Sequence, residues 1–390
     1  MDGYLWASER IKTLPPYIFS DFERKKVELQ AKGVDVIDLG IGAPDLPTPD
    51  FVSDVLKEEA KKPENHRYSS YKGCREFRQS VSEFYEKRYG VKLDPETEVL
   101  TLIGSKEGIV HLIQAMINPG EKVIIPDPGY PVYQTAVHLA GGESIPLPLD
   151  ARKGFVPQFK RLKEADIRDA KLIFLNYPSN PTAATVELDT FKKAITFAGE
   201  HNIFLAHDAA YDLVTFNGYK APSVMQVPGA KDIAVEFGSL SKSYNMTGWR
   251  IGYVVGNKEV VHLLTTLKSN VDTSQFLAIQ KAAAAALKSD HSAVRQNNNI
   301  LQKRMEKFYS ALKDIGFQLE KPRGTIFLWV KVPDQYTSMT FTNFLLEKAG
   351  IIVTPGNVFG KGGEGYIRIS LSVKEERIDE AIRRLKRLQF

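Results

Sequence analysis

The sequence contains a single cysteine, Cys74, among its 390 residues. One thiol excludes an internal disulfide framework and any metal cluster that is built on several cysteines. The sequence also has no run of about 18 or more apolar residues, and no apolar stretch of the signal-peptide type lies near its N-terminus. We therefore expect a globular, cytoplasmic protein that does not enter a membrane.

An excess of charge of one sign is missing as well. The chain has 52 basic and 47 acidic residues, and its formal net charge is only +5. Arg383, Arg384, Lys386 and Arg387 lie close together near the end, but they alternate with apolar residues at helical spacing. This pattern predicts a solvated helix face rather than a nucleic-acid site, so we expect no nucleic-acid partner.

The middle of the chain alternates apolar runs with helical segments. The predicted strands cover residues 98–103, 122–125, 171–175, 203–207, 233–237 and 251–255. The first five are each followed by a polar cluster rich in glycine, proline or hydroxyls, at 104–106, 127–130, 176–180, 208–211 and 239–250. This order is typical of a mostly parallel α/β sheet, in which ligands bind beyond the carboxyl ends of the strands. We therefore expect the five clusters to lie together.

The pattern of predicted elements changes after two helical stretches at about 273–288 and 293–315. Short strands at 325–330, 351–353 and 366–370 then alternate with helices at 341–349 and 374–388. With 43% hydrophobic residues, a chain of this length is expected to form more than one domain. We predict a large domain of residues 49–288 with the parallel sheet between helices. A smaller α+β domain of residues 289–390 would be completed by an N-terminal arm of residues 1–48, extended at Pro15 and Pro16.

Lys242 follows one of the predicted strands directly and has hydroxyls on both sides. Burial or nearby cations would lower the pKa of this lysine and make its amine a nucleophile toward a carbonyl. Ser239, Ser241 and Arg250 could hold an anion, with phosphate the obvious candidate. A lysine beside phosphate anchors points to a Schiff base with pyridoxal phosphate. Taken alone, Lys242 would be interpreted as a surface lysine, so the other clusters decide the matter.

Three of the other motifs also allow a ligand. Gly104 and Ser105 begin a predicted helix, where free backbone N–H groups and the helix dipole suit a phosphate. Tyr130 follows a Pro-Gly turn and could stack on a planar ring, or simply pack in the core. Gly42 lies in a loop rich in glycine and proline, which is either a linker or a place where the backbone approaches a ligand closely.

Together these motifs resemble the fold-type I, pyridoxal-phosphate-dependent aminotransferases of class I/II, in order and spacing over nearly the whole chain. The resemblance implies that Lys242 forms the Schiff base with the cofactor. It implies that the cofactor phosphate is bound by Gly104, Ser105, Ser239, Ser241 and Arg250, and by Tyr68 from a partner subunit.

The same resemblance assigns the remaining site residues. Tyr130 would stack on the pyridine ring, Asp208 would pair with its nitrogen, and Asn180 and Tyr211 would donate hydrogen bonds to its phenolic oxygen. Arg368 would hold the substrate α-carboxylate, beside the backbone of Gly42. The shared tyrosine implies a homodimer with shared active sites.

Elementary chemistry agrees with these roles. A buried carboxylate such as Asp208 keeps the ring nitrogen protonated, which the electron-sink chemistry of the cofactor requires. A planar guanidinium, as in Arg368, holds a carboxylate better than an ammonium does. Once displaced by the substrate, Lys242 is a free amine that can move a proton as general base and acid. In one departure from the family, Ala183 follows Thr182 where a glycine is usual.

The substrate is indicated by three shorter runs, residues 10–17, 38–49 and 104–108, which resemble LL-diaminopimelate aminotransferases. Lys106 occupies the position of a lysine that lies near cofactor and substrate in those enzymes. The resemblance implies amino-acid biosynthesis, with an amino group moved between LL-diaminopimelate or tetrahydrodipicolinate and the glutamate/2-oxoglutarate pair. An aspartate, alanine or aromatic aminotransferase and a β-elimination lyase are the alternatives. A regulatory module that binds the cofactor without catalysis is disfavoured, because the catalytic set is complete and no appended DNA-binding segment is expected.

Overall fold

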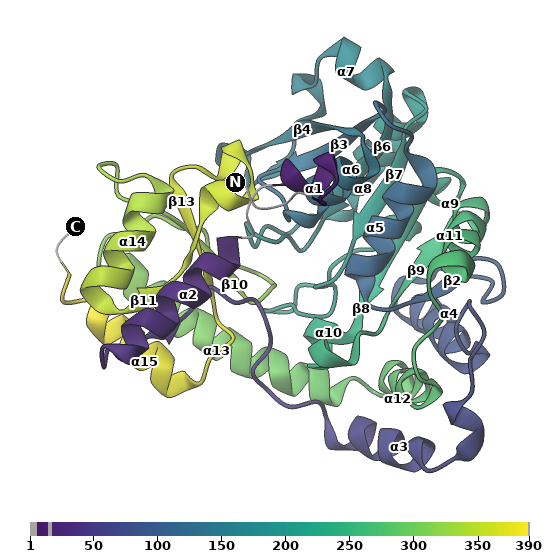
Figure 1. Cartoon of the computed structure of the whole chain (residues 1–390), viewed down its shortest axis with the longest axis horizontal. Coiled ribbons are helices and arrows are strands. Elements are labelled where there is room, and N and C mark those ends of the chain that lie inside the picture. Colours follow the sequence, from purple (N-terminus) through teal and green to yellow (C-terminus); the bar gives the residue numbers. More distant parts are fainter. Residues whose placement is uncertain (1–5, 15–17, 389–390) are drawn as a thin grey trace.

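The computed structural model describes residues 6–14 and 18–388, and residues 18–23 by their backbone alone. Pro15, Pro16 and Tyr17, which belong to the predicted extended arm, lie outside the described residues. Figure 1 shows a larger unit built on a wide sheet and a smaller unit beside it. None of the described helices is long and apolar enough to span a bilayer.

An eight-stranded sheet with the order β2-β9-β8-β7-β6-β3-β4-β5 forms the centre of the large unit. The pairs β8-β7, β7-β6, β6-β3 and β3-β4 are parallel, whereas β9 is antiparallel to both of its neighbours and β5 to β4. The predicted mostly parallel sheet is therefore confirmed. Its strands are β2 (Val99–Leu102), β3 (Lys122–Asp127), β4 (Glu143–Asp150), β5 (Val156–Pro157), β6 (Ala170–Asn176), β7 (Phe204–Asp208), β8 (Ala234–Ser239) and β9 (Gly252–Gly256).

Helices cover both faces of this sheet, because the strands bury apolar side chains on each side. One face packs against α5 (Ser105–Met116), α6 (Val132–Ala140) and α11 (Lys258–Val271). The other packs against α4 (Arg75–Tyr89), α8 (Leu188–Glu200) and α9 (Ala230–Ile233), with α12 (Leu277–Lys288) lying between α4 and α3 (Asp50–Ala60). The short helices α7 (Glu164–Arg168) and α10 (Leu240–Ser243) lie in connections.

Strand β4 was not predicted, and its prolines explain why. Pro146 and Pro148 interrupt the run ESIPLPLD, and proline argues against a central strand. In the fold, β4 pairs along its length with β3 on one side, whereas on the other side β5 pairs only with Leu149 and Asp150. The backbone N–H groups that the two prolines lack therefore cost the sheet little stability, because that side of the strand has no continuous partner.

The small unit contains the antiparallel sheet β10-β13-β12 and the short parallel pair β1-β11. Ile37 and Asp38 of the N-terminal arm pair with Ile351 and Ile352, so the arm completes the small unit as predicted. Its strands are β1 (Ile37–Asp38), β10 (Phe327–Lys331), β11 (Ile351–Ile352), β12 (Thr354–Pro355) and β13 (Tyr366–Ser370). Its helices are α2 (Ile18–Ala31), α13 (Ser292–Asp314), α14 (Ser338–Ala349) and α15 (Glu375–Leu385), while α1 (Glu9–Lys12) contacts α6 of the large unit.

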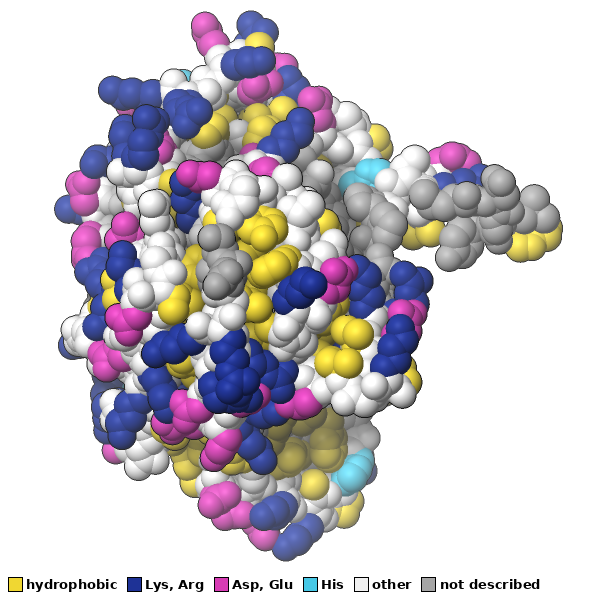
Figure 2. Space-filling model, turned by 90° about the vertical axis from the view of Figure 1, so that its left-hand side faces the viewer, with side chains coloured by type: hydrophobic (Ala, Val, Ile, Leu, Met, Phe, Trp, Pro, Cys, Tyr) yellow, Lys and Arg dark blue, Asp and Glu magenta, His cyan; other side chains and the backbone are white. Residues whose placement is uncertain are grey.

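Of the basic residues near the C-terminus, Arg383 and Arg384 lie on α15 as the helical spacing predicted, whereas Lys386 and Arg387 follow its end. Arg383 and Arg384 both form ion pairs with Glu380, and Arg384 also reaches Asp35. The opposite side of the helix buries Ile378 and Leu385. Figure 2 shows acidic side chains interspersed among the basic ones on this side of the molecule. The arginines of α15 therefore belong to an ion-paired helix face.

Ala183, where the family usually has glycine, adopts a left-handed backbone conformation with φ 56°. An L-residue pays about 1–2 kcal/mol for this conformation, and glycine gives back about half of that through its greater freedom in the unfolded chain. We expect Ala183→Gly to stabilise the apoprotein by about 0.5–1 kcal/mol, visible as a small rise in the calorimetric melting temperature. An unchanged or lower melting temperature would show that the methyl group contributes packing that offsets the strain.

Candidate active site

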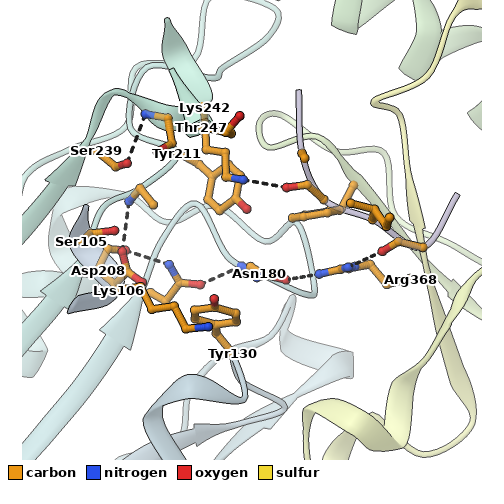
Figure 3. A pocket seen from close by; sticks show the side chains of 18 of the residues that line it. Ser105, Lys106, Tyr130, Asn180, Asp208, Tyr211, Ser239, Lys242, Thr247 and Arg368 are labelled. Atoms are coloured by element: carbon orange, nitrogen blue, oxygen red, sulfur yellow. Dashed lines mark hydrogen bonds between the residues drawn. The ribbon is translucent and has the colours of Figure 1, made fainter. Parts of the chain in front are cut away.

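The carboxyl ends of β2, β3, β6, β7 and β8 lie at one edge of the sheet, where they face the small unit across a cavity of about 600 Å³. The cavity brings together nearly all the predicted site residues, as Figure 3 shows. Those that line it are Gly42, Ser105, Lys106, Tyr130, Asn180, Asp208, Tyr211, Ser239, Ser241, Lys242, Arg250 and Arg368. Two predicted residues are not part of the lining: Gly104 lies directly behind it, and Tyr68 is 91% exposed elsewhere on this chain.

Lys242 lies in the short helix α10, immediately after β8. Its Nζ donates a hydrogen bond to the carbonyl oxygen of Gly42 at 2.6 Å. Burial lowers the pKa of Lys242 to about 8, and repulsion from Arg368 and Arg250 adds to this effect against the attraction of Asp208. At pH 7 about a tenth of such an amine is neutral, compared with about three in ten thousand for an ordinary lysine. Lys242 is therefore prepared to act as a nucleophile and as a base.

A cradle of polar side chains, made by Ser105, Ser239, Ser241 and Arg250, lies at the start of α5. The hydroxyl of Ser239 accepts the backbone N–H of Ser241 at 3.2 Å, and this bond fixes the turn into α10. Arg250 has a left-handed backbone (φ 55°), and its Nη1 donates to the carbonyl oxygen of Thr247 at 3.0 Å. A non-glycine residue is uncommon in that region and is found mostly where the surroundings enforce it. Two hydroxyls, a guanidinium and a helix N-terminus together suit a phosphate group.

Gly104 is essential to this arrangement for a steric reason. It has φ +80°, and a Cβ atom at this position would lie 2.4 Å from Nη2 of Arg250. Only glycine therefore lets the guanidinium of Arg250 lie against the backbone that begins α5.

Asp208 ends β7 at the base of the pocket and is only 4% exposed. Its carboxylate accepts hydrogen bonds from the hydroxyl of Tyr133 at 2.8 Å and from the backbone N–H of Ala210 at 3.3 Å. Burial raises the pKa of Asp208, and the hydrogen bond from Tyr133 opposes that shift. No basic side chain in the described part of the chain forms an ion pair with it. The site thus presents a buried carboxylate that a cationic group on a ligand would stabilise.

The pocket contains two tyrosines, of which one offers the face of its ring and the other a hydrogen-bond donor. Tyr130 is half-buried, and its ring meets that of Tyr133 edge-on, with centroids 5.8 Å apart. Tyr211 is 4% exposed, and burial raises the pKa of its hydroxyl far above the usual range, so this hydroxyl remains a hydrogen-bond donor.

Arg368 reaches the pocket from β13 of the small unit, opposite Lys242 and Asp208 (Figure 3). Its Nη1 donates to Oδ1 of Asn180 at 2.8 Å, and its Nη2 donates to the carbonyl oxygen of Gly40 at 2.7 Å. Its guanidinium carbon lies 4.2 Å from the ring centroid of Phe327 and 4.9 Å from that of Phe359. Held between two rings, the guanidinium presents a fixed planar fork of the shape that a carboxylate requires.

Four residues that position the site were not singled out from the sequence. Asn176 donates to the carbonyl oxygen of Asp208 at 2.8 Å and accepts the backbone N–H of Asn180 at 2.7 Å, so it links two site residues. It is the last residue of β6, and a polar side chain at the end of an apolar strand was a usable signal. Tyr133, Phe327 and Phe359 gave no such signal, because aromatic residues are usual in cores.

Chain and pocket together define a transaminase. The sequence profile described as "Aminotransferase class I and II" matches residues 34–385, and the chain belongs to that family. It is an enzyme that acts on an amino acid and a 2-oxo acid.

Individual relatives show which kinds of aminotransferase the chain is similar to. An "LL-diaminopimelate aminotransferase" of Moorella thermoacetica is 47% identical over 381 residues, which cover 98% of each chain. One of Aquifex aeolicus is 48% identical and covers 98% of this chain and 99% of that one. Among solved structures, a "probable N-succinyldiaminopimelate aminotransferase" from Thermus thermophilus superimposes with a TM-score of 0.91 at 35% identity, covering 95% of this chain and 99% of that one.

Proposed function

We propose that the enzyme uses pyridoxal phosphate bound to Lys242, and that LL-diaminopimelate is its amino donor, with 2-oxoglutarate as acceptor. The proposal rests on one observation. A single cavity contains a lysine whose pKa is about 8, a buried carboxylate and a guanidinium fork. Each of these three groups suits a different part of the cofactor and substrate, and together they leave room for both.

The residues present fit the cofactor. The cradle of Ser105, Ser239, Ser241 and Arg250, with the Gly104 backbone behind it, would hold the phosphate. Asp208 would face the ring nitrogen, Tyr130 would stack on the ring, and Asn180 and Tyr211 would donate to its phenolic oxygen. Lys106 would lie at the edge of the same site. When bound, pyridoxal phosphate supplies a carbonyl carbon for the amine of Lys242 and an electron sink for the substrate.

The chain's own groups perform the remaining work. Arg368 binds and orients the α-carboxylate, and its ring neighbours exclude water from one side. Asp208 supplies the negative charge that keeps the ring nitrogen protonated. Lys242, once displaced, accepts the proton from the substrate Cα at Nζ and later returns it. A lysine of ordinary pKa would be protonated at neutral pH and unable to accept this proton.

A pH dependence follows for cofactor capture. Because the pKa of Lys242 is lowered to about 8, the neutral and reactive fraction of the amine grows as the pH rises toward 8 and approaches one above it. We expect the rate at which the apoprotein captures pyridoxal phosphate to rise about tenfold per pH unit up to pH 8 and then to level off. Stopped-flow absorbance between pH 6.5 and 9.5 measures this rate. A rise that continues beyond pH 9.5 would mean that the lysine has an ordinary pKa.

Tyr68 supports a homodimer with shared active sites as part of the same proposal. It is 91% exposed on one chain, near the half-exposed Tyr71 in sequence, and neither side chain forms a hydrogen bond or ring contact with another described residue. A second copy would bury these rings and bring Tyr68 to the partner's phosphate cradle. Light scattering should then give a mass of twice 43.7 kDa, and a mass of 43.7 kDa would contradict the dimer.

LL-diaminopimelate is favoured as donor by the names of the similar enzymes and by Lys106. This lysine is exposed in the pocket lining, where its ammonium could meet the distal carboxylate of a long dicarboxylic donor. We expect kcat/KM with LL-diaminopimelate and 2-oxoglutarate to exceed the values for aspartate, alanine and phenylalanine by about tenfold or more, since one further charged contact supplies about 1.4 kcal/mol. Efficient turnover of another donor with no turnover of LL-diaminopimelate would overturn this substrate.

A further inference from the structure

A second cavity, of about 520 Å³, lies between helix α4, the end of helix α12 and the segment before α13. It shares no lining residue with the active-site pocket, and none of its residues takes part in the chemistry proposed above. Its charged lining consists of Lys87, Arg88, Lys220 and Lys288 against the single acid Glu83, with His291 beside them. This lining carries three net positive charges when His291 is neutral.

The lysines of this cavity are poorly compensated by the protein, whereas Arg88 is attracted by the buried carboxylate of Asp212. Neither Lys87 nor Lys220 forms an ion pair with any acidic side chain of the described residues, and the Nζ of Lys288 lies 4.0 Å from Glu83. Elsewhere on this surface lysines have close partners, as in the pairs Lys57–Asp54 and Lys61–Glu58. Several like charges around a concave surface raise the local potential and attract anions.

Arg88 adds a directed donor to this charge. Its Nη2 donates to the backbone carbonyl of Asp212 at 3.2 Å, and its guanidinium lies over the ring of Tyr89 at 5.3 Å. Its Nε–H is buried and has no hydrogen-bond partner among the described residues. A buried donor without an acceptor costs about 1–3 kcal/mol, so a turn of the guanidinium that brings this hydrogen to an oxyanion in the cavity would be favoured.

His291 also lines the cavity. It is held in a left-handed conformation (φ 59°), and its Nδ1 lies 2.6 Å from the hydroxyl of Tyr244. The pKa of His291 is lowered, first by burial and then by repulsion from Arg88 and Lys87, as expected in a region of positive potential. The ring of Tyr244 is fully buried, and Lys242 lies two residues before it in the chain.

We propose that this cavity is a second binding site, for a small phosphate-bearing anion. The net charge, the unsatisfied donor of Arg88 and the concave shape each favour an oxyanion with several acceptor atoms, and phosphate groups provide these most densely. The volume accommodates a phosphorylated metabolite of modest size rather than a bare ion alone. Lys87, Lys220 and Lys288 supply charge, and Arg88 fixes the position of the anion.

Isothermal titration with pyrophosphate tests the site. The protein is first loaded with pyridoxal phosphate, so that the cradle of Ser239 and Arg250 is filled, and chloride holds the ionic strength constant. We expect one pyrophosphate per chain, with an affinity that falls about tenfold or more in the double variant Lys87→Glu, Lys220→Glu, since two of the four positive charges of the site are reversed. Both side chains are exposed, so this variant should melt at the wild-type temperature.

Two further variants test whether the loss of pyrophosphate affinity is specific to this cavity. The exposed pair Lys160→Glu, Lys192→Glu changes the net charge equally at another place and should leave the affinity within about twofold. Arg88→Lys keeps the charge but loses the Nε–H donor and should also weaken binding. The proposal is overturned if pyrophosphate does not bind at millimolar concentration, or if the Lys87, Lys220 variant binds as tightly as the Lys160, Lys192 control. Neither result depends on which amino donor the enzyme prefers.

Discussion

Replacement of Lys242 by alanine is expected to lower kcat by about 10⁴-fold or more, because one side chain provides both the covalent anchor and the proton transfer. Lys242 and Lys106 are the two lysines among the described residues that line the pocket, and Lys106 is exposed. Loss of the Lys242 amine should also abolish the absorption band of the lysine-bound cofactor. The phosphate cradle is untouched, so the variant should still bind pyridoxal phosphate without a covalent bond.

Lys106→Ala is the matched control, since it removes the other lysine of the pocket lining. This variant should keep the absorption band and most of kcat with small donors such as alanine, because its ammonium is exposed and placed for the distal part of a substrate. Steady-state kinetics and absorption spectra of the two variants measure the difference. If Lys242→Ala kept the absorption band while Lys106→Ala lost it, Lys106 rather than Lys242 would be the covalent anchor of the cofactor.

Arg368→Lys is expected to reduce kcat/KM by about 10²–10³-fold, since breaking one partner of a buried charged contact costs about 3–4 kcal/mol. The guanidinium is fixed by Asn180 and Gly40 and lies between the rings of Phe327 and Phe359. An ammonium cannot present two parallel donors in that slot, although it keeps the charge. Because the loss concerns the substrate carboxylate, KM should rise while the absorption of the bound cofactor stays unchanged.

Arg323→Lys separates this effect from a general loss of structure. Arg323 also lies over an aromatic ring, at 4.4 Å from Tyr219, and donates to Glu187 and Thr185, but it is absent from the active-site lining. Its replacement should leave kcat/KM within about twofold, as usual for an exposed ion pair. Equal losses in both variants would remove Arg368 from its proposed role as the carboxylate ligand.

Much of the site could be predicted from the sequence because polar residues that follow apolar strands have few structural reasons to be there. The convergence of Ser105, Tyr130, Asn180, Asp208 and Lys242 follows from that pattern and from the parallel sheet alone. Arg368 is different. It lies within a strand of the small unit, and only the family resemblance connected it with the other residues before the fold showed the contact with Asn180.

The parts that could not be predicted depend on tertiary contacts. Tyr133 is buried among aromatic residues, and only the fold shows that its hydroxyl donates to Asp208. Strand β4 could not be predicted because it contains prolines, and the sequence does not reveal that one side of this strand lacks a continuous partner. The steric need for glycine at position 104 likewise arises from Arg250, which is distant in the chain. The role proposed for Tyr68 depends on a second copy of the chain.

Transfer of a labelled amino group tests the central claim most directly. The protein loaded with pyridoxal phosphate is incubated with LL-diaminopimelate that carries ¹⁵N in its amino groups and with unlabelled 2-oxoglutarate, and the products are analysed by mass spectrometry. We predict that the ¹⁵N appears in glutamate in step with loss of the donor, and that no label is transferred by Lys242→Ala. Release of the label as ammonia, or glutamate without label, would contradict an aminotransferase that works on Lys242 with this donor.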